Sequence, residues 1–227
     1  MNLPENYQPL FIGHFHDGQQ WQYLPMSSRE VRRAMRVVLQ LLDSFRFPAR
    51  SSALVIAGHD EWALSIPLET ALTTNKMILF NADASPFEAP RIEAFIRRFD
   101  PPMVFGLSGE VLQGLESAGH DPGTLFNGRV VWTPDASAYH RLMAETEARV
   151  FRMMMIGPAL AMECSQGCGL HIDAEEWTLG REGGEIVVTH RLGRQPALIR
   201  QKTGISGSID DSVCRCGSAS PRVTPED

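Results

Sequence analysis

The sequence predicts an α/β protein: a largely parallel sheet layer with helices on both faces, followed by a small antiparallel β unit. Before residue 156, short apolar runs alternate with amphipathic segments, which is the pattern of strands joined by crossover helices. After Gly157, the segments become short, strand-like runs separated by glycine turns. We therefore expect an α/β parallel-sheet subdomain over 1–156, a small β subdomain over 157–217 and a flexible tail over 218–227.

Composition limits the class of protein. The chain has 227 residues, of which 43% are hydrophobic and 21% charged, as in globular domains. Its net charge of -6, with no basic cluster, argues against nucleic acid as a partner. No apolar run approaches the roughly 18 residues of a membrane span, and the first residues lack a signal-peptide pattern. We expect a cytoplasmic protein that does not bind membranes.

The first long element is a helix. Residues 1–26 are predicted to be irregular. Within them, His14 and His16 would share one face if this segment were a strand; a metal pair is then the alternative to ordinary surface histidines. The motif Ser27-x-x-Glu30 is a capping box, which predicts a helix from there to about residue 45. Its apolar stripe consists of Val31, Met35, Val38, Leu39 and Leu42.

The sheet layer follows. Its predicted strands are Ala53–Ala57, Lys76–Phe80, Met103–Leu107, Arg129–Trp132 and Val150–Met155. The helices predicted between them are Glu61–Thr74, Ser85–Phe99, Ser108–Leu115 and Ser137–Ala148. Ligands of such sheets bind at the carboxyl ends of the strands. Candidate cleft residues there are His59, Asp60, Glu61, Ser108 and Asp135, with an exposed polar turn as the alternative for residues 59–61.

The predicted β unit contains every cysteine of the chain. Its strands are expected at His171–Asp173, Trp177–Leu179, Glu185–Thr189 and Ala197–Arg200. Around them stand Cys164, Cys168, Cys214 and Cys216, with His171 three residues after the second cysteine. Thiolate and imidazole groups are the ligands that structural zinc prefers, and such a site closes with four of them. Five candidates therefore compete for four positions. Free or buried thiols are the alternative, and a disulfide is disfavoured without a secretory segment.

The same stretch resembles the phenylacetate-CoA ligase family of adenylate-forming enzymes. The matching residues are Gly157–Cys164, Gly169–Ile172, Gly184–Thr189, Leu198–Arg200, Thr203–Gly204, Cys214–Gly217 and Pro221–Arg222. The resemblance implies an adenylate-forming-enzyme-like N-terminal part, and it adds Thr203 to the candidate cleft. It also implies a structural Zn2+ site formed by Cys164, His171, Cys214 and Cys216. Cys168 has no counterpart in the family pattern and is the reserve ligand.

The chain departs from the family at its catalytic motifs. The slot of the phosphate loop, residues 13–20, lacks the hydroxyl residues and the lysine that bind ATP. Residues 150–157 contain no glutamate for magnesium, and Ile205 replaces the aspartate that binds ribose. The chain also stops where the family's mobile C-terminal domain would begin. We therefore expect no ATP or Mg2+ cofactor, no catalytic residue and no adenylation.

Two classes of function remain open. The first is a non-catalytic relative of the ligases that binds a small acyl or aryl molecule or a partner protein. The second is an enzyme that uses the fold for ATP-independent acyl or thioester chemistry, with His59, Asp60 or Glu61, and Cys168 as its candidate groups. A non-catalytic subunit of a ligase-type complex is a further alternative.

Overall fold

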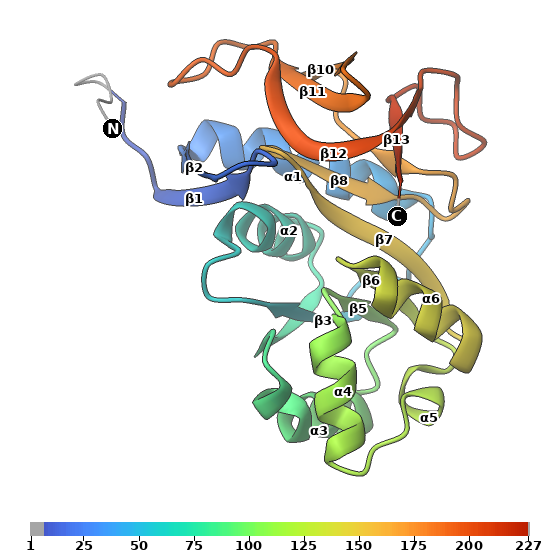
Figure 1. Ribbon diagram of the computed structural model, residues 1–227. Coiled ribbons are helices and arrows are strands. Elements are labelled where there is room, and N and C mark those ends of the chain that lie inside the picture. Colours follow the sequence, from blue (N-terminus) through green and yellow to red (C-terminus); the bar gives the residue numbers. More distant parts are fainter. Residues whose placement is uncertain (1–6, 227) are drawn as a thin grey trace. The chain divides into compact units, whose positions relative to one another are not determined.

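The computed structural model describes residues 7–226, which divide into two compact units (Figure 1). The parallel-sheet unit comprises residues 46–59 and 69–154. The β-rich unit comprises the remaining segments, up to residue 45, 60–68 and from 155 onward. This division differs from the expected one at 156, because the first segment joins the later strands instead of the parallel sheet. Residues 1–6 of the expected irregular segment and Asp227 of the expected tail lie outside the described residues.

The parallel-sheet unit contains the predicted parallel sheet. Its strands are β3 (Ser52–Ala57), β4 (Ile78–Asp83), β5 (Met103–Phe105), β6 (Val130–Thr133) and β7 (Arg149–Ile156). Their order is β4-β3-β5-β6-β7, and every neighbouring pair is parallel. Ala53 lies beside Met103, so two of the predicted strands are neighbours in this sheet. The fold-class prediction is thus confirmed, and the continuous apolar runs of these strands fit a sheet buried on both faces.

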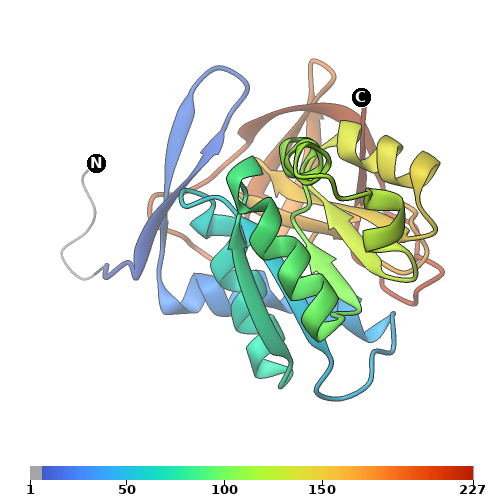
Figure 2. The same ribbon diagram turned by 90° about the horizontal axis from the view of Figure 1, so that it is seen from below.

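Helices join these strands and supply the core. They are α2 (Trp62–Thr74), which crosses from one unit to the other, η1 (Pro86–Glu88), α3 (Ala89–Phe99), α4 (Gly109–Ser117), α5 (Pro122–Phe126) and α6 (Ala136–Glu145). Figure 2 shows the green helix α3 running alongside the strands of this unit, and residues of α3 and α4 pack in the same core as the sheet. Ile92, Ile96 and Val111 from these helices pack against Leu54 and Val104 of the sheet. Ile92 and Ile96 of the predicted helix thus belong to the core, and Phe95 packs against it only partly buried.

The β-rich unit contains an antiparallel sheet, as expected. Its strands are β8 (Ala159–Glu163), β9 (Leu170–His171), β10 (Trp177–Glu182), β11 (Glu185–His190), β12 (Gln201–Asp210) and β13 (Arg222–Pro225). Their order is β10-β11-β12-β13-β9-β8. The predicted strand at Ala197–Arg200 is wrong, because Arg200 has a left-handed φ of 48° and the strand begins only at Gln201.

The expected tail contains β13. This strand pairs with β12 on one side and with β9 on the other, and Val223 is fully buried. Arg222 is also buried, and it donates hydrogen bonds to Asp210 and to the backbone oxygen of Ser212. The prediction of a flexible tail is therefore wrong for residues 222–225, because the polar Arg222 has its partners within the β-rich unit.

The first described segment forms a hairpin and a helix. Residues 11–26, expected as irregular, are the antiparallel strands β1 (Phe11–His16) and β2 (Trp21–Met26). Helix α1 (Ser28–Asp43) starts at the predicted capping box, where the Glu30 carboxylate accepts the Ser27 N–H at 2.6 Å. Its buried stripe packs against β8. None of the described helices combines the length and apolar character that a bilayer crossing requires.

Candidate metal centre

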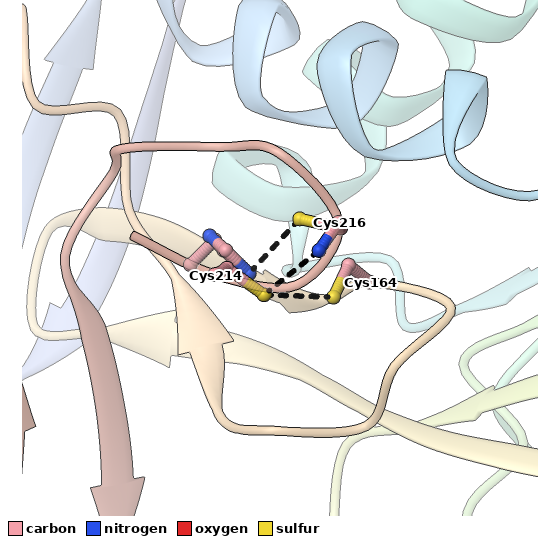
Figure 3. A group of neighbouring side chains, drawn as sticks. Cys164, Cys214 and Cys216 are labelled. Atoms are coloured by element: carbon pink, nitrogen blue, oxygen red, sulfur yellow. Dashed lines mark hydrogen bonds between the residues drawn. The ribbon is translucent and has the colours of Figure 1, made fainter. Parts of the chain in front are cut away.

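Three cysteines and a histidine converge in the β-rich unit. Cys164 follows β8, His171 ends β9, and Cys214 and Cys216 lie in the loop between β12 and β13. Their ligand atoms all lie within 4.8 Å of one another. Figure 3 shows the cysteine side chains pointing toward a common centre. The sheet order explains this convergence, since β9 and β13 are neighbours and β8 pairs with β9.

The spacings within this cluster fit one tetrahedral ion. Two thiolates bound to zinc at about 2.3 Å lie about 3.8 Å apart in a tetrahedron. The sulfurs of Cys164 and Cys214 are 3.7 Å apart, and the Cys216 sulfur lies 3.8 Å from Nε2 of His171. The loop is held in this shape by backbone bonds, in which the Gly217 N–H donates to the Cys214 oxygen at 2.9 Å. The structure therefore contains a Cys/His cluster that could bind a metal.

The protonation states of two ligands suit metal binding. His171 is fully buried, and burial together with the nearby Arg222 lowers its pKa to about 4, so the imidazole is neutral at neutral pH. Burial raises the pKa of Cys214, but hydrogen bonds from the Cys216 N–H and the neighbouring thiols outweigh it and bring that pKa to about 7. A neutral imidazole and a thiolate are the forms that coordinate zinc. Burial raises the pKa of the Cys164 thiol, which would have to lose its proton for a metal to bind.

Cys168 lies beside the cluster without joining it. Its sulfur is 3.1 Å from that of Cys214, which is shorter than the spacing of two thiolates on one tetrahedral zinc. Cys168 is exposed, whereas Cys164 and Cys214 are buried. Of the described residues, only Cys164, His171, Cys214 and Cys216 form a group of this kind. His14 and His16 do share one face of β1, where both rings contact Trp21 edge to face.

Three cleft candidates lie in the parallel-sheet unit. Ser108 follows β5 and caps α4 by accepting the Val111 N–H. Asp135 follows β6, caps α6, and also accepts the Gly109 N–H at 3.1 Å, so the ends of these two strands are joined. His59 follows β3 with an exposed ring, and its Nε2 lies 3.4 Å from the carboxylate of Asp83. All of them lie at the carboxyl ends of parallel strands, as predicted.

The other candidates lie in the β-rich unit. The Asp60 carboxylate is 3.7 Å from Nε2 of His14. The backbone oxygen of Glu61 accepts the N–H groups of Leu64 and Ser65 in the first turn of α2. Thr203 is buried, and its hydroxyl donates to the Ile186 oxygen at 2.8 Å. The hydroxyl of Thr203 therefore already has a partner within the sheet.

Two carboxylates that the sequence analysis did not single out accept hydrogen bonds from backbone N–H groups. Asp17, at the tip of the β1–β2 hairpin, accepts the N–H groups of Gln19 and Gln20, both at 2.9 Å. These backbone bonds and one from Gln22 hold the pKa of Asp17 below its usual range. The Asp-Gly pair at the tip is the sequence signal for such a turn, because an aspartate side chain readily accepts backbone N–H groups two residues on.

Glu185 plays the same part at an irregular point of β12, where its pairing with β11 shifts register. Its carboxylate accepts the N–H groups of Thr203 at 3.1 Å and Gly204 at 2.7 Å. The hairpin tip and this part of β12 touch: a Cβ atom placed on Gly204 would lie 2.5 Å from the Cα of Gly18. The structure thus brings together the slot of the phosphate loop and the Thr-Gly motif, and at both places a carboxylate of this protein accepts the backbone N–H groups.

Solved structures of other proteins have a similar fold. No family model matches the sequence, and no curated protein matches it. Among solved structures, 2-hydroxyisobutyryl-CoA ligase in complex with 2-HIB-AMP and CoA is similar with a TM-score of 0.73 and 13% identity, over 95% of this chain and 52% of that one. O-succinylbenzoate coenzyme A synthetase from Bacillus subtilis, in complex with AMP, is similar with a TM-score of 0.52 and 12% identity, over 93% and 48%.

The present chain therefore spans about half the length of the ligases it matches. At such low identity the likeness concerns architecture, and the narrower resemblance to the phenylacetate-CoA ligase family stays a prediction. The parallel sheet, the antiparallel sheet and their connections together give this chain an adenylate-forming-enzyme-like α/β fold.

Proposed function

We propose that this chain is a zinc-stabilised relative of the adenylate-forming ligases that binds a ligand on that scaffold without adenylating it. The observation that carries this proposal is that the Asp17 carboxylate already accepts backbone N–H groups at the tip of the β1–β2 hairpin. A phosphate-binding loop works by aiming free N–H groups at an anion. At this tip the carboxylate of Asp17 accepts those of Gln19 and Gln20.

The charge of Asp17 adds to this effect. Because its pKa is lowered, the carboxylate is ionised at neutral pH and repels an incoming triphosphate. The Gly18 N–H also has a partner, since it donates to Nδ1 of His16 at 3.1 Å. Nearby, Glu185 takes the Thr203 and Gly204 donors, and Ile205 offers no acceptor to a ribose hydroxyl. Together these features oppose nucleotide binding in the manner of the ligases.

Ligand binding is proposed at the carboxyl ends of the parallel strands. The Ser108 and Asp135 turns meet there through the Gly109 N–H, and His59 and Asp83 form a second polar pair at the end of β3 and β4. Parallel sheets present their binding crevices at this edge. A small acyl or aryl molecule is the ligand class that the ligase-like scaffold favours.

The proposed metal is a structural zinc ion held by Cys164, His171, Cys214 and Cys216. The spacing of these ligand atoms supports it, as does the neutral state of His171. Four protein ligands leave no position for water or substrate, so zinc here would supply folding energy and no catalytic chemistry.

Pyrophosphate release tests the absence of adenylation. Purified protein given ATP, magnesium and a panel of alkyl and aryl acids is expected to release none above background, with a competent CoA ligase as the positive control. The Ile205→Asp variant is expected to stay inactive, because it restores one hydrogen-bond acceptor and leaves Asp17 at the tip. Release of pyrophosphate by the wild-type protein with any acid would sink the proposal.

A further inference from the structure

The strand β4 forms an open edge of the parallel sheet. In the described part of the chain it pairs with β3 alone, so the backbone groups on its other side face no strand. Its first three residues are Ile78, Leu79 and Phe80, and none of these is fully buried. Soluble proteins normally protect such an edge with charges, prolines or a covering segment, because an exposed apolar edge pairs with other strands.

The strand at the opposite end of the same strand order, β10, shows that protection. β10 ends in Gly180, Arg181 and Glu182, with the two charged residues exposed. Edge lysines, arginines and glutamates oppose pairing with a further strand. The first three residues of β4 carry no such charge.

An aromatic cluster extends this edge onto α3. Phe80 stacks on Phe99 with ring centroids 4.4 Å apart, and on Phe95 at 5.4 Å. Ile78 is 52% exposed and Phe99 is 43% exposed, although both are large and apolar. We call Ile78, Phe80, Phe95 and Phe99 the α3/β4 face. An exposed apolar face of this kind marks an interaction site more often than a plain surface.

The charges on α3 indicate what covers this face. Glu88 stands at the start of the helix and pairs with Arg91 at 3.3 Å. In the last turn Arg97 pairs with Glu93 at 2.8 Å, and the guanidinium of Arg98 lies over the ring of Phe99. Because Phe99 contacts Phe80 near the start of β4, α3 runs in the opposite direction to that strand. A second α3 lying antiparallel beside the first would place the arginines of each helix next to the glutamate of the other. The face is therefore complementary in charge to a second copy of itself.

We propose that two copies of this chain associate through β4. The two β4 strands pair antiparallel about a twofold axis, so that the two parallel sheets become one continuous sheet and the two α3/β4 faces meet. Such a contact is isologous: it uses the same patch on both copies and closes at a dimer, without continuing into fibres. Main-chain hydrogen bonds supply affinity, and the aromatic cluster and the α3 charges fix the register.

Analytical ultracentrifugation of the purified chain over a wide concentration range tests the dimer. The wild-type protein is expected to sediment as a dimer and the Ile78→Lys variant as a monomer, because lysine places charge in the strand pair. Ile199→Lys is the matched control: Ile199 is 71% exposed and lies outside β4, so this variant is expected to remain dimeric. Circular dichroism confirms that both variants are folded.

A charge swap separates this contact from any other dimer. Arg98→Glu and Glu88→Arg are each expected to raise the dimer dissociation constant at least tenfold, and the double variant is expected to restore it toward the wild-type value. A wild-type protein that is monomeric at all concentrations overturns the proposal. A dimer that survives Ile78→Lys also overturns it, and so does a double variant weaker than both single ones.

Discussion

At the scale of the residue, Cys214 is the cysteine of the candidate metal site that contacts each of the other three. Its sulfur accepts the Cys216 N–H, and the sulfurs of Cys164 and Cys168 lie 3.7 and 3.1 Å away. Those neighbours explain why its thiol ionises most readily among the cluster's shifted thiols. A metal at this point would join the end of β8 to the loop before β13, closing a segment of about fifty residues.

The cysteines differ in what their loss should do. We expect one zinc per wild-type chain, and we expect Cys216→Ser to lower that content and to reduce the free energy of unfolding by about 3 kcal/mol or more, because zinc binding is coupled to folding. Elemental analysis and urea unfolding measure the two effects. Cys168→Ser is the control and should change both little. Metal-free wild-type protein, prepared without chelator, would refute the zinc site.

At the scale of the element, the tip of the β1–β2 hairpin and the Thr203–Gly204 segment of β12 pack against each other. Gly18 has a φ of 93° and Gly204 a φ of 70°, and the two backbones are in contact. Only glycine adopts such angles freely and leaves room for so close an approach. The β1–β2 hairpin is thereby held against β12, although the two lie far apart in the sequence.

Alanine substitutions should separate the two contributions of these glycines. At Gly183, with a φ of 60° and no atom within 4 Å of an added Cβ, alanine should cost about 1–2 kcal/mol through backbone strain alone. Gly204→Ala carries similar strain and also forces its Cβ against Gly18, so it should cost more. It should also speed amide exchange at the hairpin tip. Equal losses in the two variants would contradict a role for the contact.

The sequence predicted regular apolar elements well and polar ones poorly. The strands of the parallel sheet were predictable because they carry continuous apolar runs, as β3 does. Helix α1 was predictable because it carries an apolar stripe and begins at a capping box. The β1–β2 hairpin was missed because its outward face carries histidines and aromatics that hide the alternation of Phe11, Gly13 and Phe15. β13 was missed because Arg222 is buried only through partners contributed by β12 and its loop.

The candidate site divides in the same way. Cysteine clustering and the family resemblance were enough to name four candidate ligands, whose ligand atoms the fold brings within 4.8 Å of one another. Asp17 and Glu185 could not be assigned, because their importance depends on which amide each carboxylate reaches. A side chain that bonds the backbone of a neighbouring strand distant in sequence, as Glu185 does, has no signal in local sequence.

At the scale of the whole molecule, the two units are stabilised differently. The core of the parallel-sheet unit is apolar. The buried ionisable residues of the described chain all lie in the β-rich unit: Glu30, Glu163, His171, Asp173, Glu176, His190, Arg194 and Arg222. Buried charges depend strongly on their partners, so loss of one partner is costly. The β-rich unit should therefore be the more sensitive of the two to removal of the metal.

Chelation should reveal that difference. Treatment with a strong zinc chelator is expected to increase hydrogen exchange in peptides from 155–226 and from α1, because the four ligands lie on strands and loops of the β-rich unit. Peptides from 69–154 should keep their protection, since their core contains no ligand. Mass spectrometry of exchanged peptides measures both. Simultaneous loss of protection in both units would show that they unfold as one.

The packing of α1 against β8 has a consequence for how the chain folds. Helix α1 ends at Asp43, and the strand that covers its apolar stripe begins only at Ala159. During synthesis at about 5–20 residues per second, that stripe waits roughly 6–25 s for its partner. The segment between them contains most of the parallel-sheet unit, which can fold in that time from contacts closer in sequence. A nascent chain therefore exposes Val31, Val38 and Leu42 to solvent or chaperones while its middle third is already folded.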